Sequence, residues 1–135
     1  MRILRRVLES VAAHARENFP RESCGILLAG VEGPSRVRLS LRAENAEKAH
    51  PEHAYVLGHK AHIKAVEMEF SGTARIIGYY HSHPNGGPRP SQNDVQQAVA
   101  GVTYLIVGVC DGKIEHGAWQ LKDDQLVQEP LEVRK

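Results

Sequence analysis

The sequence predicts a mixed α/β domain in which helices flank a central mixed, largely antiparallel sheet. Two patterns predict it: helical and strand periodicities alternate along the first two thirds of the chain, and apolar runs separated by turn residues dominate the last third. The length of 135 residues suits one domain, and no linker, internal repeat or low-complexity tract divides the chain. Residues 1–135 are therefore expected to form a single domain.

The first third of the chain predicts a helix followed by a hairpin. Apolar residues recur every three or four positions over residues 2–18, which indicates an amphipathic helix that ends before Pro20. Residues 25–29 form a continuous apolar run typical of a buried strand, and a turn containing Gly and Pro follows. Residues 36–42 alternate charged and apolar side chains, with Val37, Leu39 and Leu41 facing inward, so this strand is expected to pair back on the first.

The rest of the chain predicts two further helices and several strands. A short strand is expected at residues 55–57, and residues 60–70 place Ile63, Val66 and Phe70 on one face of a second helix. Residues 75–80 form an apolar strand, the Pro- and Gly-rich residues 84–90 a loop, and residues 91–100 a third helix. Three later runs predict strands joined by Asp-Gly and Asp-Asp turns: residues 103–109, 114–121 and 125–133.

Composition excludes several classes of protein. Seventeen Lys+Arg against sixteen Asp+Glu give a net charge of +1, which argues against a nucleic-acid partner. No segment approaches the roughly 18 apolar residues that span a membrane, and the arginine-rich N-terminus lacks the apolar stretch of a signal peptide. Cys24 and Cys110 each lie in an apolar run, so we expect buried, reduced thiols in a cytoplasmic protein. No pattern indicates an oligomeric state.

Histidine is unusually frequent, with eight in the chain. Four of them lie close together in the sequence: His50, His53, His59 and His62. His59 and His62 are three residues apart on the expected second helix and can share a face, but the group has no neighbouring cysteine and no recognised zinc-site spacing. A solvated helix face is therefore the simpler prediction. His14 and His116 stand alone and are expected on the surface.

Another pair of histidines ends the strand predicted at residues 75–80. His81 and His83 are two residues apart, so their side chains point to the same face of a strand. Two imidazoles placed in this way can bind one zinc ion at distances of about 2.0–2.1 Å. A surface pair has the same spacing, so this signal is weak on its own.

Ser91 and Asp94 strengthen the signal from the histidines. They have the spacing of a capping box, in which a Ser and an acid three residues later cap the start of a helix. The loop at residues 84–90 is long enough to bring this helix start beside His81 and His83. Asp94 then supplies a third ligand, and zinc with three protein ligands keeps its fourth position for water, as in catalytic sites. Ser91 can cap the helix and still donate its hydroxyl proton to a developing oxyanion.

The spacing His81-x-His83-x7-Ser91-x-x-Asp94 matches without departure the motif of the JAMM (MPN-plus) zinc metalloprotease family. The run Glu22-Ser-Cys-Gly-Ile-Leu also resembles the acid-containing turn and strand upstream in that family. The likeness extends over nearly the whole chain. The order of its motifs and its length are similar to those of the compact prokaryotic members of JAB-domain type. The resemblance implies a cytidine-deaminase-like JAB/MPN fold, with one zinc ion per chain bound by His81, His83 and Asp94.

The same resemblance implies two catalytic residues. Glu22 would hold and deprotonate the zinc-bound water, and Ser91 would stabilise the tetrahedral oxyanion. Residue spacing by itself does not separate Glu22 from Glu17 or Glu44, because only the family motif makes that choice.

Three functions are compatible with these residues. The leading one, implied by the resemblance, is a zinc-dependent isopeptidase or peptidase that hydrolyses a bond at the C-terminal tail of a ubiquitin-like sulfur-carrier protein. The alternative is a non-catalytic scaffold module that binds a ubiquitin-like partner; inactive relatives usually lose a ligand position, and none is lost here. The third is a zinc hydrolase or deaminase for small molecules, although the His-x-Glu and Pro-Cys-x-x-Cys signature of nucleobase deaminases is absent.

Overall fold

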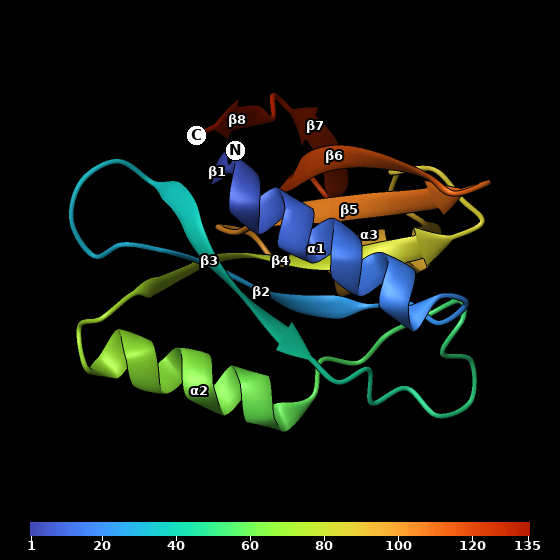
Figure 1. Ribbon diagram of the computed structural model, residues 1–135, viewed down its shortest axis with the longest axis horizontal. Helices are drawn as coiled ribbons and strands as arrows, with labels where there is room; N and C mark the ends of the chain where they lie inside the picture. Colours follow the sequence, from blue (N-terminus) through green and yellow to red (C-terminus); the bar gives the residue numbers. More distant parts are fainter.

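Eight strands and three helices follow one another along residues 1–135, all of which the computed structural model describes. Their bounds are β1 Arg2–Leu4, α1 Arg5–Asn18, β2 Cys24–Ala29, β3 Arg36–Ala43, α2 His59–Phe70, β4 Arg75–Pro84, α3 Gln92–Gln97, β5 Thr103–Cys110, β6 Lys113–Lys122, β7 Gln125–Glu129 and β8 Glu132–Arg134. The strands form one sheet in the order β7-β6-β5-β4-β2-β3-β1-β8 (Figure 1). Four of its seven strand pairs are antiparallel and three are parallel, so the predicted mixed, largely antiparallel sheet with flanking helices is confirmed.

The two longer helices pack on opposite faces of the sheet (Figure 1). Leu27 of the central strand β2 packs in the core beneath α1, whereas its neighbours Ile26 and Leu28 pack in the core beneath α2, as the alternation of a strand requires. All six residues of β2 are buried, which explains why this strand is a continuous apolar run. Tyr79 of β4 belongs to the core beneath α2, so His81, two residues later, points to the same face.

Tight turns join β5 to β6 and β6 to β7, as the sequence predicts. Asp111 and Gly112 have φ angles of 53° and 76°, and Asp123 and Asp124 have φ angles of 50° and 63°. Two consecutive residues with positive φ give a two-residue turn whose twist matches that of the flanking strands. Glycine and aspartate tolerate this left-handed conformation better than most residues, which explains the turn sequences.

Several predicted boundaries are wrong near the ends of elements. Residues 2–4 form β1 rather than the first turn of a helix, because they pair with β3 and β8 and bury Ile3 completely. The strand predicted at residues 125–133 is divided into β7 and β8 around Pro130, which has no backbone N–H for the ladder. Of residues 55–57, only Leu57 forms an isolated bridge, with Asn45, and the third helix already ends at Gln97.

Two burial predictions are also wrong. The register of β3 against β2 shifts between Val37 and Leu39, so Val37 packs beneath α1 while Leu41 packs beneath α2. Leu39 itself is 39% exposed. Cys24 is buried as predicted, but Cys110 is exposed because it is the last residue of β5, next to the turn.

The apolar stripe of α2 faces away from the sheet. Ile63, Val66 and Phe70 share one face of the helix, as predicted, but they are 57%, 43% and 94% exposed. Ala61 and Ala65 make the contact with the sheet instead. Neither α2 nor any other helix in the structure has the length and apolar character needed to cross a bilayer.

Candidate metal centre

His81 and His83 lie together on the face of β4 that is covered by α2. Their Nε2 atoms are 3.2 Å apart, with His81 almost fully buried and His83 partly buried. Ser82, between them, points to the other side, where its hydroxyl oxygen accepts hydrogen bonds from the backbone N–H of Ser23 (2.8 Å) and the hydroxyl of Ser23 (3.0 Å). The alternation of the strand therefore directs both imidazoles to one point and ties the residue between them to the segment that carries Glu22.

Asp94 of α3 reaches both histidines. Its Oδ1 lies 3.0 Å from Nε2 of His81 and its Oδ2 lies 3.0 Å from Nε2 of His83. The predicted capping box is present: the Ser91 backbone N–H donates to Oδ2 of Asp94 (2.9 Å), and the Asp94 backbone N–H donates to Oγ of Ser91 (3.1 Å). The helix start thus orients the Asp94 carboxylate, and the loop at residues 84–90 returns it to the histidines as predicted.

Glu22 is the acidic residue that the fold brings to this cluster. One ligand atom each of Glu22, His81 and His83 lies within 4.8 Å of the others, and Glu22 is only 5% exposed. The two alternatives lie elsewhere, because Glu17 forms an ion pair with Arg42 and Glu44 is an exposed residue. The backbone of Glu22 is held at both ends: its N–H donates to Pro51 and its carbonyl accepts from Nδ2 of Asn45 (2.8 Å and 3.1 Å).

Burial and neighbouring charges shift the pKa values of these groups in different directions. Burial raises the pKa of Glu22 to about 7; the nearby His83 opposes the shift and Asp94 adds to it. Burial also opposes ionisation of Asp94, but hydrogen bonds from His81 and His83 outweigh it and hold the pKa of Asp94 well below its usual range. Burial lowers the pKa of His81, whereas in His83 the hydrogen bond and charge of Asp94 outweigh burial and raise its pKa.

The arrangement of donor atoms fits a metal ion. The two Nε2 atoms lie 3.2 Å apart, and each lies 3.0 Å from an oxygen of Asp94. These distances are near the roughly 3.3 Å that separates ligand atoms bound tetrahedrally to one ion at about 2.0–2.1 Å. Nδ1 of His83 donates to the Gly87 carbonyl at 3.1 Å, which leaves a lone pair on Nε2 facing the Asp94 carboxylate. A lone pair and a carboxylate repel each other unless a proton or a cation lies between them. The cluster formed by Glu22, His81 and His83 could therefore hold a metal ion, and Asp94 contacts both of its histidines.

Two residues that support the cluster were not predicted from the sequence. The ring of Tyr55 stacks on His81, with centroids 4.7 Å apart and planes 25° from parallel. Asn45 joins three segments, because its Nδ2 donates to the carbonyls of Glu22 (3.1 Å), Pro51 (3.4 Å) and Ala54 (3.1 Å). The only sequence signal for Tyr55 is that it is an aromatic residue among the histidines at residues 50–62. No local pattern points to Asn45, since its partners lie 6–23 residues away.

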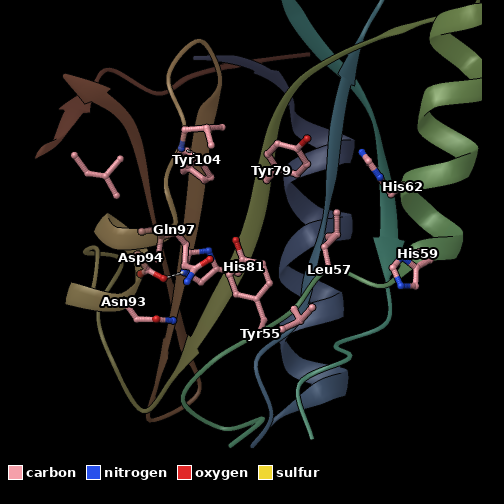
Figure 2. Close-up of a pocket in the computed structure, with 14 residues that line it drawn as sticks. Tyr55, Leu57, His59, His62, Tyr79, His81, Asn93, Asp94, Gln97 and Tyr104 are labelled. Atoms are coloured by element: carbon pink, nitrogen blue, oxygen red, sulfur yellow. Dashed lines mark hydrogen bonds and ion pairs between the residues drawn. The ribbon is translucent and has the colours of Figure 1, made fainter. Parts of the chain in front are cut away.

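Two recesses meet at the cluster and differ in character. One, of about 480 Å³, is mainly apolar; His81 and Asp94 line one part of it, and His59 and His62 of α2 line the opposite side (Figure 2). Its apolar lining is Tyr55, Val56, Leu57, Tyr79, Val99, Tyr104, Ile106 and Leu126. The other recess, of about 400 Å³, is polar and is lined by Glu22, His83 and Ser91 among others. The cluster therefore lies between an apolar and a polar surface.

The other six histidines differ in how exposed they are. His50, His53, His59 and His62 are exposed, as predicted. The prediction for His14 is wrong: it is 5% exposed, on the inner face of α1, and its Nδ1 lies 2.7 Å from the hydroxyl of Tyr80. Burial, with a contribution from the charge of Arg42, lowers the pKa of His14 to about 4. His116, also expected on the surface, is partly buried.

A protein-family model described as prokaryotic homologs of the JAB domain matches residues 4–122. The chain belongs to this family. The resemblance to JAMM proteins is thereby confirmed. A desampylase of Haloferax volcanii is 34% identical over 116 residues, covering 82% of this chain and 81% of the relative. A CysO-cysteine peptidase of Mycobacterium tuberculosis is 29% identical over 129 residues, covering 94% of this chain and 86% of the relative.

Solved structures show the same JAB-domain fold. A solution structure of a Desulfitobacterium hafniense protein has a TM-score of 0.84 and 28% identity, and the match covers 100% of this chain and 94% of that chain. A structure described as JAMM, a metalloprotease-like zinc site in the proteasome and signalosome, has a TM-score of 0.62 and covers 100% of this chain and 98% of that chain. At 18% identity the second match supports the fold alone.

Proposed function

We propose that residues 1–135 act as a single zinc-dependent JAMM-type peptidase domain. Its substrate is the peptide or isopeptide bond at the C-terminal tail of a ubiquitin-like protein of sulfur-carrier type. The observation that carries the proposal is the convergence of two imidazole nitrogens and a carboxylate within 3.2 Å, beside the buried carboxyl of Glu22. The family supports the same activity, since the relatives named above are a desampylase and a CysO-cysteine peptidase.

In this proposal His81, His83 and Asp94 hold one zinc ion per chain. A bound zinc ion polarises the scissile carbonyl and lowers the pKa of a water molecule to about 7. The chain prepares its ligands for this role: Asp94 is oriented by the capping box, and the Gly87 carbonyl orients the ring of His83.

Glu22 moves the protons of the reaction. Its carboxylate accepts a proton from the attacking water while the water oxygen adds to the carbonyl carbon. The same proton then passes to the leaving nitrogen as the C–N bond breaks, so that one water yields a carboxylic acid and an amine. A pKa of about 7, which burial gives this carboxyl, suits a group that must both accept and donate a proton near neutral pH.

Ser91 supplies a hydrogen-bond donor at the developing oxyanion. Its Oγ already accepts the Asp94 backbone N–H at 3.1 Å, so the capping contact uses a lone pair and leaves the hydroxyl proton free. Donors of this kind typically contribute about 10²–10³ in rate.

The proposal also includes the partners and the location of the chain. The apolar recess beside His81 and Asp94 would take an extended tail. We propose no nucleic-acid partner, because the net charge is only +1. The two cysteines are unpaired, which supports a reducing compartment such as the cytoplasm.

The test is cleavage by the zinc-loaded protein of a ubiquitin-like sulfur carrier fused at its C-terminus to a second protein. We expect Glu22→Gln to lower the rate by about 10²-fold or more while the protein keeps one zinc per chain. Glu17→Gln is the matched control, since Glu17 is an exposed acid that pairs with Arg42, and it should cleave at the wild-type rate. Equal cleavage by Glu22→Gln would remove Glu22 from the mechanism, and a wild-type protein that binds zinc without cleaving would favour the scaffold alternative.

A further inference from the structure

The outer face of α2 carries an apolar stripe that no other part of the chain covers. Ile63, Val66 and Phe70 are all exposed, and Phe70 is 94% exposed. Figure 1 shows α2 packed on the sheet along one side, with no other element on its opposite side. Single exposed apolar residues are ordinary on protein surfaces, whereas a contiguous stripe marks a surface that binds another molecule. The face is therefore a candidate interaction surface.

The spacing of this stripe fits a second helix. His59, an exposed residue at the start of α2, extends it by one turn, so that its members follow at steps of four, three and four residues: His59, Ile63, Val66 and Phe70. We call these four residues the α2 stripe. Steps of four and three residues form the seam along which two helices of a coiled coil pack. The 12 residues of α2 make about three turns, so a partner helix of similar length would cover the stripe.

The charges beside the α2 stripe complement a second copy of the same helix. On one side of the stripe lie Lys60, near the start of the helix, and Glu67, near its end. Both are exposed, and their side chains form no ion pair or hydrogen bond with the protein. On the other side His62 and Glu69 have the same order, although Glu69 also accepts a hydrogen bond from the backbone N–H of Ile76 (2.9 Å). Each side thus has a basic residue towards the start and an acid towards the end.

An antiparallel pairing of two copies uses this order. When two helices pack antiparallel about a twofold axis, each side of one helix faces the same side of the other, with its direction reversed. Lys60 of each copy then lies beside the partner's Glu67. The register that places Val66 against the partner's Ile63 also places Phe70 against the partner's His59. Apolar contacts along the seam and opposite charges beside it are therefore satisfied in one arrangement.

The same charges fit an anionic membrane poorly. Two lysines and two glutamates lie on α2, so its positive and negative charges are balanced apart from the histidines. A helix that binds to a membrane surface carries an excess of Lys and Arg on its polar face. A protein surface of mixed charge is the better match, and α2 itself provides one.

We propose that two copies of this chain associate through their α2 helices, packed antiparallel about a twofold axis. His59 lines the apolar recess, so the partner's Phe70 would lie at the border of that recess and each copy would contribute to the recess of the other. The pairing does not depend on the proposed peptidase activity. Two short helices form an interface at the small end of the known range, so we expect a dimer that dissociates at micromolar concentrations.

Sedimentation equilibrium of the full chain tests the association. It is measured from about 10 µM to 1 mM at low ionic strength, with reductant present because Cys110 is exposed and unpaired. We expect a monomer–dimer equilibrium, and we expect Phe70→Ser to raise the dissociation constant about 10-fold or more, since aromatic residues at the centre of an interface carry much of its affinity. The fold should tolerate this change because the side chain is exposed. A wild type that stays monomeric up to 1 mM overturns the proposal.

Reversal of charge tests the antiparallel arrangement. Lys60→Glu places two acids opposite each other twice in the dimer, so it should weaken association about 10-fold, and Glu67→Lys should do the same. The double variant Lys60→Glu/Glu67→Lys restores opposite charges across the twofold axis and should associate like the wild type. Lys113→Glu is the matched control, because Lys113 is an exposed lysine at the start of β6, and it should not weaken association. A double variant as weak as the single ones overturns the antiparallel pairing.

Backbone amide NMR locates the interface and separates a second copy from the substrate. On dilution of the wild type, we expect the signals that shift to belong to α2 and to the border of the apolar recess. Shifts confined to another surface would overturn the proposal. A wild type that stays monomeric, and whose α2 signals shift only when a ubiquitin-like sulfur carrier is added, would assign the α2 stripe to the substrate and would also overturn it.

Discussion

Two pairs of histidines, His81/His83 and His59/His62, illustrate what distinguishes the candidate metal centre from other histidines of this molecule. Both pairs have spacings that place two imidazoles on one face of their element, a strand in the first case and a helix in the second. His81 is almost fully buried and His83 partly buried, and both contact Asp94. The side chains of His59 and His62 are exposed and make no hydrogen bond or ion pair with the protein. The spacing of the imidazoles is therefore not what distinguishes the pairs.

The two pairs differ in whether a carboxylate from another element contacts them and in how deeply they are buried. Asp94 comes from another element, and the capping box at the start of α3 orients it before any ligand binds. His81 and the α2 pair line the same apolar recess at separate points, with His81 beside Asp94 and the α2 pair across from it (Figure 2), whereas His83 lines the polar recess. The tertiary fold places a carboxylate within 3.0 Å of both imidazoles of the strand pair, and the α2 pair has no such partner.

The largest effect is expected from removing a member of the strand pair. We predict that His83→Gln lowers zinc affinity by more than the roughly 10–100-fold lost when an outer-shell partner is removed. Competition with a fluorescent zinc chelator measures the change. His53→Gln is a demanding control, because His53 lines the polar recess with His83 but does not contact Asp94. If both variants lost zinc equally, the contrast between the buried pair and the exposed histidines would fail.

An intermediate effect is expected from His14, which is buried like His81 but forms no hydrogen bond with a carboxylate. Its Nδ1 contacts the Tyr80 hydroxyl and its Nε2 accepts from Asn18. Burial, with the charge of Arg42, lowers its pKa from 6.5 to about 4, while Glu17 opposes the shift. Because the folded state has the lower pKa, protonation favours the unfolded state, and stability is lost as pH falls from about 6.5 towards 4.

The loss attributable to His14 should reach about 3 kcal/mol at the acid end of this range. Urea unfolding of the metal-free protein at pH 7.5 and at pH 4.5 measures it. His14→Gln, which keeps a polar side chain opposite Tyr80, should lose less stability than the wild type over the same interval. Parallel losses in the two proteins would show that His14 is not the group that titrates.

How much of this contrast could be predicted depends on how local each interaction is. The common face of His81 and His83 follows from the period of a strand, and the capping box follows from the spacing of Ser91 and Asp94, so both were predicted and are present. The likeness to a family identified Glu22, but its position results from contacts with Asn45 and Pro51 across a long loop. Contacts of that kind leave no periodic pattern in the sequence.

Burial was predicted less well than element type, and for a physical reason. The pattern of α2 correctly indicated a helix, but its small residues Ala61 and Ala65 face the sheet and Phe70 is 94% exposed. Short side chains allow a helix and a sheet to approach closely, and hydrophobicity alone does not show which face does so. The prediction for His14 was wrong in the opposite sense, because this polar residue is buried. A polar side chain on the inner face of α1 is acceptable when Tyr80 supplies a hydrogen-bond partner.

The smallest effect is expected from the double variant His59→Gln/His62→Gln, which tests the helix pair directly. These residues line the apolar recess across from the cluster and contact none of its ligands. Substitutions at sites without shared partners usually act independently, so zinc affinity should stay within about two-fold of wild type in the same chelator assay. A larger loss would mean that the helix pair contributes a ligand or holds one in place, and the explanation by a carboxylate from another element would then be wrong. An unchanged affinity, alongside the loss in His83→Gln, would show that a carboxylate delivered by the fold separates a metal centre from a histidine-rich surface.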